Sequence, residues 1–268
     1  MKYIAIALLL LVAGNTVNAQ TKKATPFKLG LTETIVSKTM GETRTLNIYL
    51  PEGYDTSKAQ YPVIYLLDGS ANEDFIHTAG LVQYLSMYEM MPKSIVVGIA
   101  NVDRRRDYTF PTNNPEDTKL VPVFGGSEKF INFIQNELQP FIERSYRTNN
   151  FKTIIGQSLG GLLATEILMK RPTLFNDYMI ISPSLWWDKE SLLAVKPALW
   201  SARLSTPIKA YIAVGKEGDM MERPANKLVD ILKESGNVKT YFQYLPDESH
   251  LTILHNALYK GFVMMNEK

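Results

Sequence analysis

The sequence contains no cysteine among its 268 residues and only three histidines. A chain without cysteine forms no disulfide, has no thiolate nucleophile and offers no cysteine for lipid attachment. The histidines are scattered, and no H-E-x-x-H pattern joins any of them. The sequence therefore predicts no metal site and no cofactor.

An excess of charge of one sign is also lacking. Lys and Arg number 29 against 27 Asp and Glu, which leaves a formal net charge of +2. No basic stripe with interleaved aromatic residues occurs, so nucleic acid is not an expected partner. No apolar run is long enough to cross a bilayer comfortably, so we expect no membrane insertion. None of these patterns bears on the oligomeric state.

The first residues do have a recognisable pattern. A charged start at Met1-Lys2 precedes an apolar stretch over 4–12 and a small-residue exit ending at Ala19. This pattern is typical of a secretory signal peptide, so we predict that 1–19 is cleaved and that the protein is periplasmic or extracellular in a bacterium. Residues 20–268, rich enough in apolar side chains for one core, are expected to form a single domain.

Near-continuous apolar runs alternate with helical patterns along the rest of the chain. Runs such as 61–67 and 95–100 are typical of strands covered on both faces. The predicted strands are 45–50, 61–67, 95–100, 153–155, 178–182, 209–214 and 238–244, and the predicted helices are 75–90, 127–141, 161–170, 224–235 and 251–262. This alternation predicts an α/β fold with a doubly wound, mostly parallel sheet and helices on both faces.

The most informative motif is Gly156-Gln157-Ser158-Leu159-Gly160, a G-x-S-x-G sequence. A β-branched run precedes it and a helical pattern follows it, which is the strand, turn and helix context of a nucleophile elbow. In such a turn the serine has strained backbone angles that project its hydroxyl from the sheet edge. Ser158 is therefore the predicted nucleophile.

A serine hydroxyl is a poor nucleophile near neutral pH, so Ser158 needs a base, normally a histidine oriented by a carboxylate. In an elbow of this type the histidine comes from a loop after the last strand. His250 lies in such a loop, whereas His77 and His255 lie in predicted helices. We predict His250 as the base.

The acid is expected just after the penultimate predicted strand. Glu217 is the first candidate there and Asp219 the second, because both follow the glycine turn at Gly215. Asp247, Glu248 or no acid at all are the remaining alternatives, since backbone carbonyls can also orient an imidazole.

An oxyanion at the acyl carbon needs two N–H donors. Leu159, directly after the serine, is the first predicted donor. The loop after 61–67 supplies the second from Gly69 or Ser70, with Ser70 slightly preferred. Glycine at position 69 would let the backbone approach the substrate closely.

At these residues the chain resembles the putative-esterase group of α/β-hydrolases, which includes esterase D, enterobactin and bacillibactin esterases and feruloyl esterases. The matching blocks are Leu66-Leu67-Asp68-Gly69, the stretch 101–109, Ser182-Pro183-Ser184-Leu185-Trp186-Trp187-Asp188 and His250-Leu251-Thr252-Ile253. The block with the tandem tryptophans is similar to the siderophore-esterase branch. One departure is Gln157, at a position where the family commonly has histidine.

The resemblance implies an α/β-hydrolase fold over about 45–262 and a substrate mouth near Arg104, Arg106, Trp186 and Trp187. A flat ring of the substrate could stack on a tryptophan, and a guanidinium could hold a nearby carboxylate. These four residues are predicted to bind substrate.

Together the residues predict a serine esterase that cleaves a carboxylic ester through an acyl-enzyme. By resemblance, its small-molecule substrate is a siderophore lactone or an acylated carbohydrate. Two alternatives stay open. An acyltransferase of the same fold would differ only in the acceptor that meets the acyl-enzyme, and a non-catalytic homologue would bind its ligand without turnover.

Overall fold

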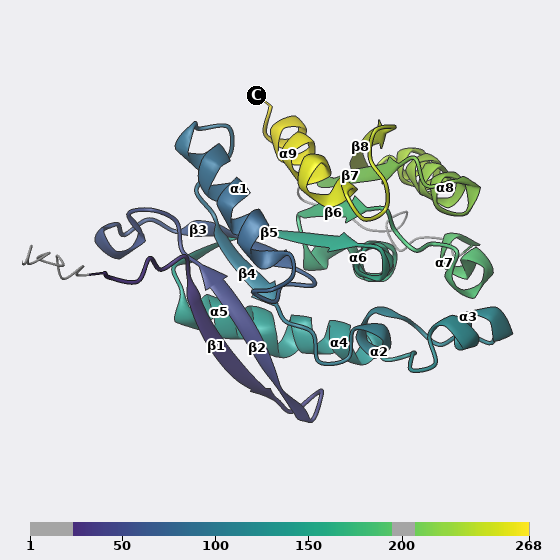
Figure 1. Ribbon diagram of the computed structural model, residues 1–268, viewed down its shortest axis with the longest axis horizontal. Helices are drawn as coiled ribbons and strands as arrows, with labels where there is room; N and C mark the ends of the chain where they lie inside the picture. Colours follow the sequence, from purple (N-terminus) through teal and green to yellow (C-terminus); the bar gives the residue numbers. More distant parts are fainter. Residues whose placement is uncertain (1–23, 195–206, 268) are drawn as a thin grey trace, which may run out of the picture.

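The computed structural model describes residues 24–194 and 207–267, so the predicted signal peptide over 1–19 lies outside the described residues. Its centre is an eight-stranded sheet of order β1-β2-β4-β3-β5-β6-β7-β8 (Figure 1). The strands are β1 Leu31–Ser37, β2 Glu42–Tyr49, β3 Tyr61–Leu66, β4 Ile95–Ile99, β5 Thr148–Gln157, β6 Asp177–Ile181, β7 Ile208–Gly215 and β8 Val238–Leu245.

The sheet is mostly parallel. β1 pairs with β2 and β2 with β4 in antiparallel register, and all the remaining neighbours are parallel. The central strands β4 and β6 are buried along their whole length, which explains their nearly unbroken apolar sequences. The predicted doubly wound parallel sheet is confirmed.

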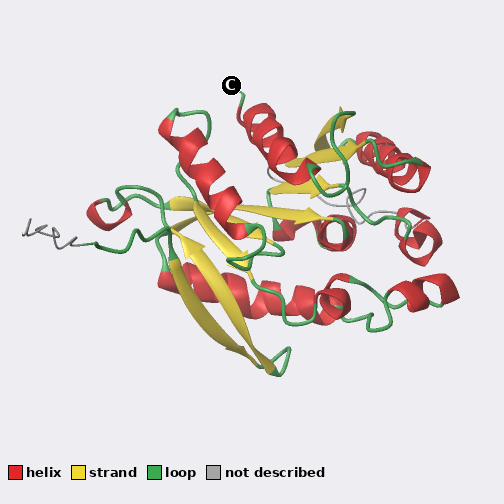
Figure 2. Ribbon diagram, viewed as in Figure 1, coloured by secondary structure: helices red, strands yellow, loops and turns green. Residues whose placement is uncertain are grey.

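Helices cover both faces of this sheet (Figure 2). One core contains α1 (Phe75–Met87) and α9 (Ile253–Asn266). The other core contains α4 (Ser127–Phe133), α5 (Gln139–Ser145), α6 (Leu159–Lys170), α7 (Ser191–Ala194) and α8 (Asp219–Ser235). Two short helices, α2 (Arg104–Tyr108) and α3 (Pro115–Leu120), follow β4.

Three elements differ from the sequence-based expectation. β1 was not predicted, because its sequence LTETIVS is polar and mostly exposed at the sheet edge. The predicted helix over 127–141 consists of α4, a π-helical turn at Ile134–Leu138 and α5. α8 begins at Asp219, ahead of Pro224, and it ends as expected where Gly236 adopts a left-handed φ of 68°.

Parallel strands bring their carboxyl ends to one edge of the sheet, and ligands of open α/β sheets bind outside that edge. The loops after β3, β5, β6, β7 and β8 all meet there in this chain. Within residues 24–194 and 207–267, no helix has the length and apolar character needed to span a membrane.

Candidate active site

Ser158 lies between the end of β5 and the start of α6, with φ 58° and ψ −119°. Glycines allow the strand and helix to meet this closely. A Cβ atom on Gly156 would lie 2.3 Å from the Gly160 carbonyl oxygen, and one on Gly161 would lie 2.9 Å from Pro183 Cα. The turn thus has the strained geometry that the G-x-S-x-G motif predicts.

His250 reaches Ser158 from the loop between β8 and α9. Its Nε2 atom lies 3.0 Å from Ser158 Oγ, which is hydrogen-bond distance. The other two histidines lie elsewhere: His77 on α1 and His255 on α9 contact one another, with their Nδ1 atoms 3.3 Å apart. Of the three histidines, His250 is the one within reach of the serine.

Glu217 holds the other side of the imidazole. Its Oε2 atom lies 2.6 Å from His250 Nδ1, while Oε1 accepts hydrogen bonds from Ser182 Oγ and from the Gly215 N–H. Burial acts to raise the pKa of Glu217, but the hydrogen bonds from His250, Ser182 and Gly215 outweigh it and lower the pKa. Glu217 is therefore an ionised carboxylate that can stabilise a charged imidazole.

The other carboxylates considered from the sequence do not contact the histidine. Asp219 is 84% exposed and pairs with Arg223. Glu248 instead accepts a hydrogen bond from Asn256. In the described chain, the geometry brings Ser158, His250 and Glu217 together in one hydrogen-bonded row.

The two predicted sources of the second oxyanion donor differ in what their N–H groups do. The Gly69 N–H donates to the Ile99 carbonyl at 3.0 Å, so it is not available to a substrate. The N–H of Ser70 has no hydrogen-bond partner in the described part of the chain. Leu159 is the first residue of α6, where an N–H has no partner inside the helix.

Gly69 itself serves a different purpose from the expected one. A Cβ atom at this position would lie 2.3 Å from Gly98 Cα on the neighbouring strand β4. The glycine is therefore required for the close approach of two backbones and not for access to the substrate, which corrects the expectation from sequence.

Three contacts at the site were missed by sequence reasoning. Ser182 donates to Glu217 from a left-handed backbone with φ 41°. Ser184 Oγ lies 3.3 Å from Ser158 Oγ. The Gln157 side-chain amide donates to the His250 carbonyl and so fixes the loop that carries the base. The block that contains Ser182 and Ser184 was noted for its tryptophans, whereas its serines make these contacts.

A cleft of about 390 Å³ opens at this edge of the sheet. Its lining residues are Asp68, Glu73, Asp74, Arg104, Gln157, Ser158, His250 and Leu251. Arg104 thus faces the cleft, but its guanidinium is paired with Asp68, with Nε 2.6 Å from Oδ1 and Nη2 2.9 Å from Oδ2. No group of three or more metal-ligating side chains occurs among the residues that the structure describes.

The structure contradicts two of the predicted substrate residues. Trp187 is fully buried, and its Nε1–H donates to the Phe110 carbonyl at 2.9 Å. Arg106 is absent from the cleft lining because its guanidinium pairs with Asp107 and Glu42. Trp186 is half-buried and packs edge-on against Trp187, and its contact with substrate stays a prediction.

The sequence of the chain is similar to a known protein family and to characterised relatives. The family model described as putative esterase matches residues 37–252. The chain is similar to the ferri-bacillibactin esterase BesA of Bacillus subtilis (strain 168), with 30% identity over 253 residues that cover 85% of this chain and 87% of that protein.

Two solved structures share the fold. An IroE-like serine hydrolase from Shewanella oneidensis superimposes with a TM-score of 0.76 at 32% identity, covering 88% of this chain and 79% of that one. The BES protein from Bacillus cereus superimposes with a TM-score of 0.79 at 27% identity, covering 92% and 98% of the two chains.

Proposed function

The chain belongs to the putative esterase family and is a carboxylic ester hydrolase, and we propose that it acts as a serine esterase through an acyl-enzyme on Ser158. The observation that carries this proposal is the row of contacts from Ser158 Oγ to His250 Nε2 at 3.0 Å and from His250 Nδ1 to Glu217 Oε2 at 2.6 Å. This arrangement has the geometry that nucleophile activation requires.

In the first step Ser158 Oγ bonds to the acyl carbon while its proton passes to His250 Nε2. Glu217 stabilises the resulting imidazolium and holds its orientation. The N–H groups of Leu159 and Ser70 donate to the oxyanion. The C–O bond to the leaving alcohol then breaks, and His250 returns its proton to that oxygen. Water repeats the sequence and releases the acid and free Ser158.

The proposed substrate is a siderophore ester. The similarity to a ferri-bacillibactin esterase along most of both chains supports this choice over an acylated carbohydrate. We further propose that residues 1–19 export the enzyme, since their pattern is that of a signal peptide.

Labelling with a fluorophosphonate tests the nucleophile directly. We expect mass spectrometry to find the adduct on Ser158 and to find none in Ser158→Ala. The same substitution should reduce hydrolysis of p-nitrophenyl acetate by on the order of 10⁴-fold or more without changing the circular dichroism spectrum. A wild-type protein that is neither labelled nor active would instead support a non-catalytic binding protein.

A substrate panel then tests the ester class. Iron-free and ferric catecholate trilactones, a feruloylated sugar and p-nitrophenyl acetate are compared by kcat/KM with product analysis. The trilactones should give the highest values. Product formation that depends on an added alcohol acceptor would point to the acyltransferase alternative.

A further inference from the structure

Asp68 is an unusual residue at the end of β3. Its φ of 55° lies in the left-handed region, which aspartate adopts more readily than most residues but still uncommonly. Both of its side-chain oxygens accept hydrogen bonds from Arg104, and Oδ1 also accepts one from Asn101 at 2.7 Å. Its own N–H donates to Tyr108 Oη at 3.0 Å. Asp68 is therefore fixed through both its side chain and its backbone.

Arg104 connects Asp68 to the elbow. Besides its two bonds to Asp68, its Nη2 atom donates to the carbonyl of Gln157 at 3.3 Å. Gln157 immediately precedes Ser158, and its own side chain donates to the His250 carbonyl. One guanidinium thus joins the end of β3, which leads to the Ser70 donor, to the strand end that carries the nucleophile.

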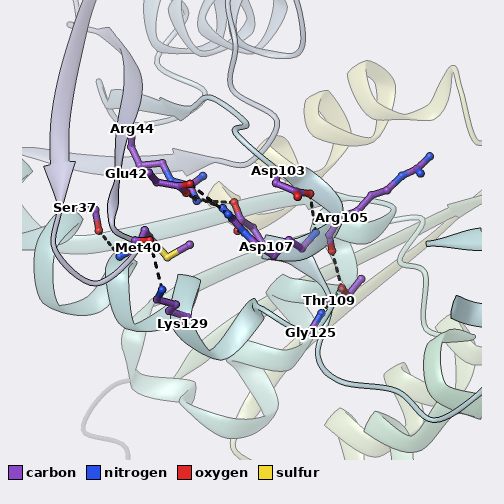
Figure 3. A network of polar contacts seen from close by, with 11 residues as sticks. Ser37, Met40, Glu42, Arg44, Asp103, Arg105, Asp107, Thr109, Gly125 and Lys129 are labelled. Carbon is purple, nitrogen blue, oxygen red and sulfur yellow. Dashed lines mark hydrogen bonds and ion pairs between the residues drawn. The ribbon is translucent and has the colours of Figure 1, made fainter. Parts of the chain in front are cut away.

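Arg104 is the first residue of helix α2. A network of charged side chains that includes Glu42, Arg44 and Asp107 lies beside this helix (Figure 3). Asp107 and Arg44 form a pair at 2.7 Å in which both side chains are 1% exposed. Arg106 bonds to Asp107 at 2.7 Å and to Glu42 at 2.7 Å. These contacts join α2 to β2. Separating the two elements would leave buried charges without partners, which is costly, so α2 is held firmly in place.

We propose that Arg104 is a positioning residue whose ion pair with Asp68 holds the Ser70 loop at a set distance from Ser158. The inference rests on the proposed serine esterase mechanism and replaces the expectation that Arg104 binds substrate. Its Nε and Nη2 atoms already donate to Asp68 and to the Gln157 carbonyl, so the ion pair fixes the guanidinium and leaves Nη1 as the atom that could still meet a substrate anion.

A positioning role and a substrate-binding role of Arg104 predict different kinetics. An interaction that matters only in the transition state lowers kcat for every ester, whereas a substrate contact raises KM for particular ones. For Arg104→Ala and Arg104→Lys we expect kcat to fall by roughly 10–10³-fold with p-nitrophenyl acetate and with a trilactone alike, because a single oxyanion donor is worth about 10²–10³-fold. KM should change by less than about threefold.

A trifluoromethyl ketone supplies an independent readout, because it forms a hemiketal oxyanion on the serine. Its inhibition constant should rise in the Arg104 variants by about the same factor as kcat falls. The matched control is Arg105→Ala, the next residue on α2, whose side chain is exposed and has no ion pair in the described chain. This variant should match the wild type in kcat and in inhibition.

A double-mutant cycle separates the pair from a general loss of structure. Asp68→Asn combined with Arg104→Lys should be scarcely slower than the slower single variant, since the two side chains act as one unit. Arg104→Lys serves in place of the alanine variant if the latter melts below the assay temperature. Unchanged kcat with acetate and a raised KM for the trilactone alone would overturn the inference. Wild-type enzyme without activity would overturn the mechanism instead.

Discussion

Buried carboxylates differ in their hydrogen bonding between the two ends of the parallel strands, which are the catalytic edge of the sheet and the edge opposite to it. At the catalytic edge Asp68 and Glu217 each have hydrogen-bond donors on both carboxylate oxygens. At the opposite edge Asp177, at the start of β6, is 8% exposed, and its carboxylate has no hydrogen bond or ion pair within the described chain. Burial raises its pKa to about 7, although Lys209 on the next strand acts to lower it.

Most non-glycine residues with positive φ in the described chain follow strands at the catalytic edge, although Glu89, ahead of β4, also has a φ of 56°. Asp68, Ser158 and Ser182 follow three neighbouring strands, β3, β5 and β6, and all three have positive φ. The opposite edge instead borders a cavity of about 350 Å³ with an apolar wall that includes Ile64, Met179 and Phe262. Both oxygens of Asp68 and Glu217 therefore have hydrogen-bond donors at the catalytic edge, whereas the carboxylate of Asp177 at the opposite edge has none in the described chain.

The largest expected effect comes from removing the charge of Glu217 at the catalytic edge. Glu217→Gln should lower kcat by on the order of 10²–10⁴-fold, because a neutral amide cannot stabilise the imidazolium that forms on His250. Steady-state hydrolysis of p-nitrophenyl acetate measures the loss. Asp219→Asn, at an exposed neighbouring carboxylate, should stay near wild type. A reversed order of the two variants would assign the acid to Asp219.

The second prediction concerns Asp177 at the opposite edge, and it is a change in the free energy of unfolding and not in the rate of hydrolysis. The pKa of Asp177 is about 7 in the folded chain, whereas the ordinary pKa of an aspartate is 3.8, so the unfolded chain releases this proton at a lower pH. The contribution of Asp177 to the free energy of unfolding is then fully present below about pH 4, and it is lost as the pH rises through about 7.

Asp177→Asn should therefore be more stable than wild type at pH 8, by about 2–4 kcal/mol at 1.36 kcal/mol per pKa unit, with little difference at pH 4. Urea unfolding at both pH values gives this comparison. Hydrolysis should remain at the wild-type rate, because Asp177 lies far from the cleft residues in the fold. Equal stability of the two proteins at every pH would mean that Asp177 is solvated.

The smallest effect concerns a single donor at the catalytic edge. Ser182→Ala removes one hydrogen bond from Glu217 and leaves those of Gly215 and His250. A hydrogen bond to a charged group is worth about 1.5–3 kcal/mol, and the remaining donors compensate in part, so we expect a kcat about tenfold lower. A pH-rate profile should keep its shape while its plateau falls. A loss as large as that of Glu217→Gln would make Ser182 a full member of the catalytic row.

The sequence predicted those parts of the molecule that local patterns determine. Ser158 was predictable because strand, turn and helix lie together in the chain, and His250 and Glu217 because each follows a strand at the same edge. The burial of Trp187 was not predictable, because its Nε1–H donates to the carbonyl of Phe110, which is distant in sequence. Arg106 was not, because its partner Glu42 is distant in sequence.

Selection for thermal stability alone would disfavour serine at position 158, where the backbone of the nucleophile elbow is strained. A non-glycine residue with φ 58° costs on the order of 1–3 kcal/mol in strain, and glycine adopts such angles freely. Ser158→Gly would therefore relieve the backbone while it removes the hydroxyl that bonds the acyl carbon. A directed-evolution campaign on this chain must score turnover together with melting temperature, because a substitution that relieves the strain at position 158 removes the nucleophile.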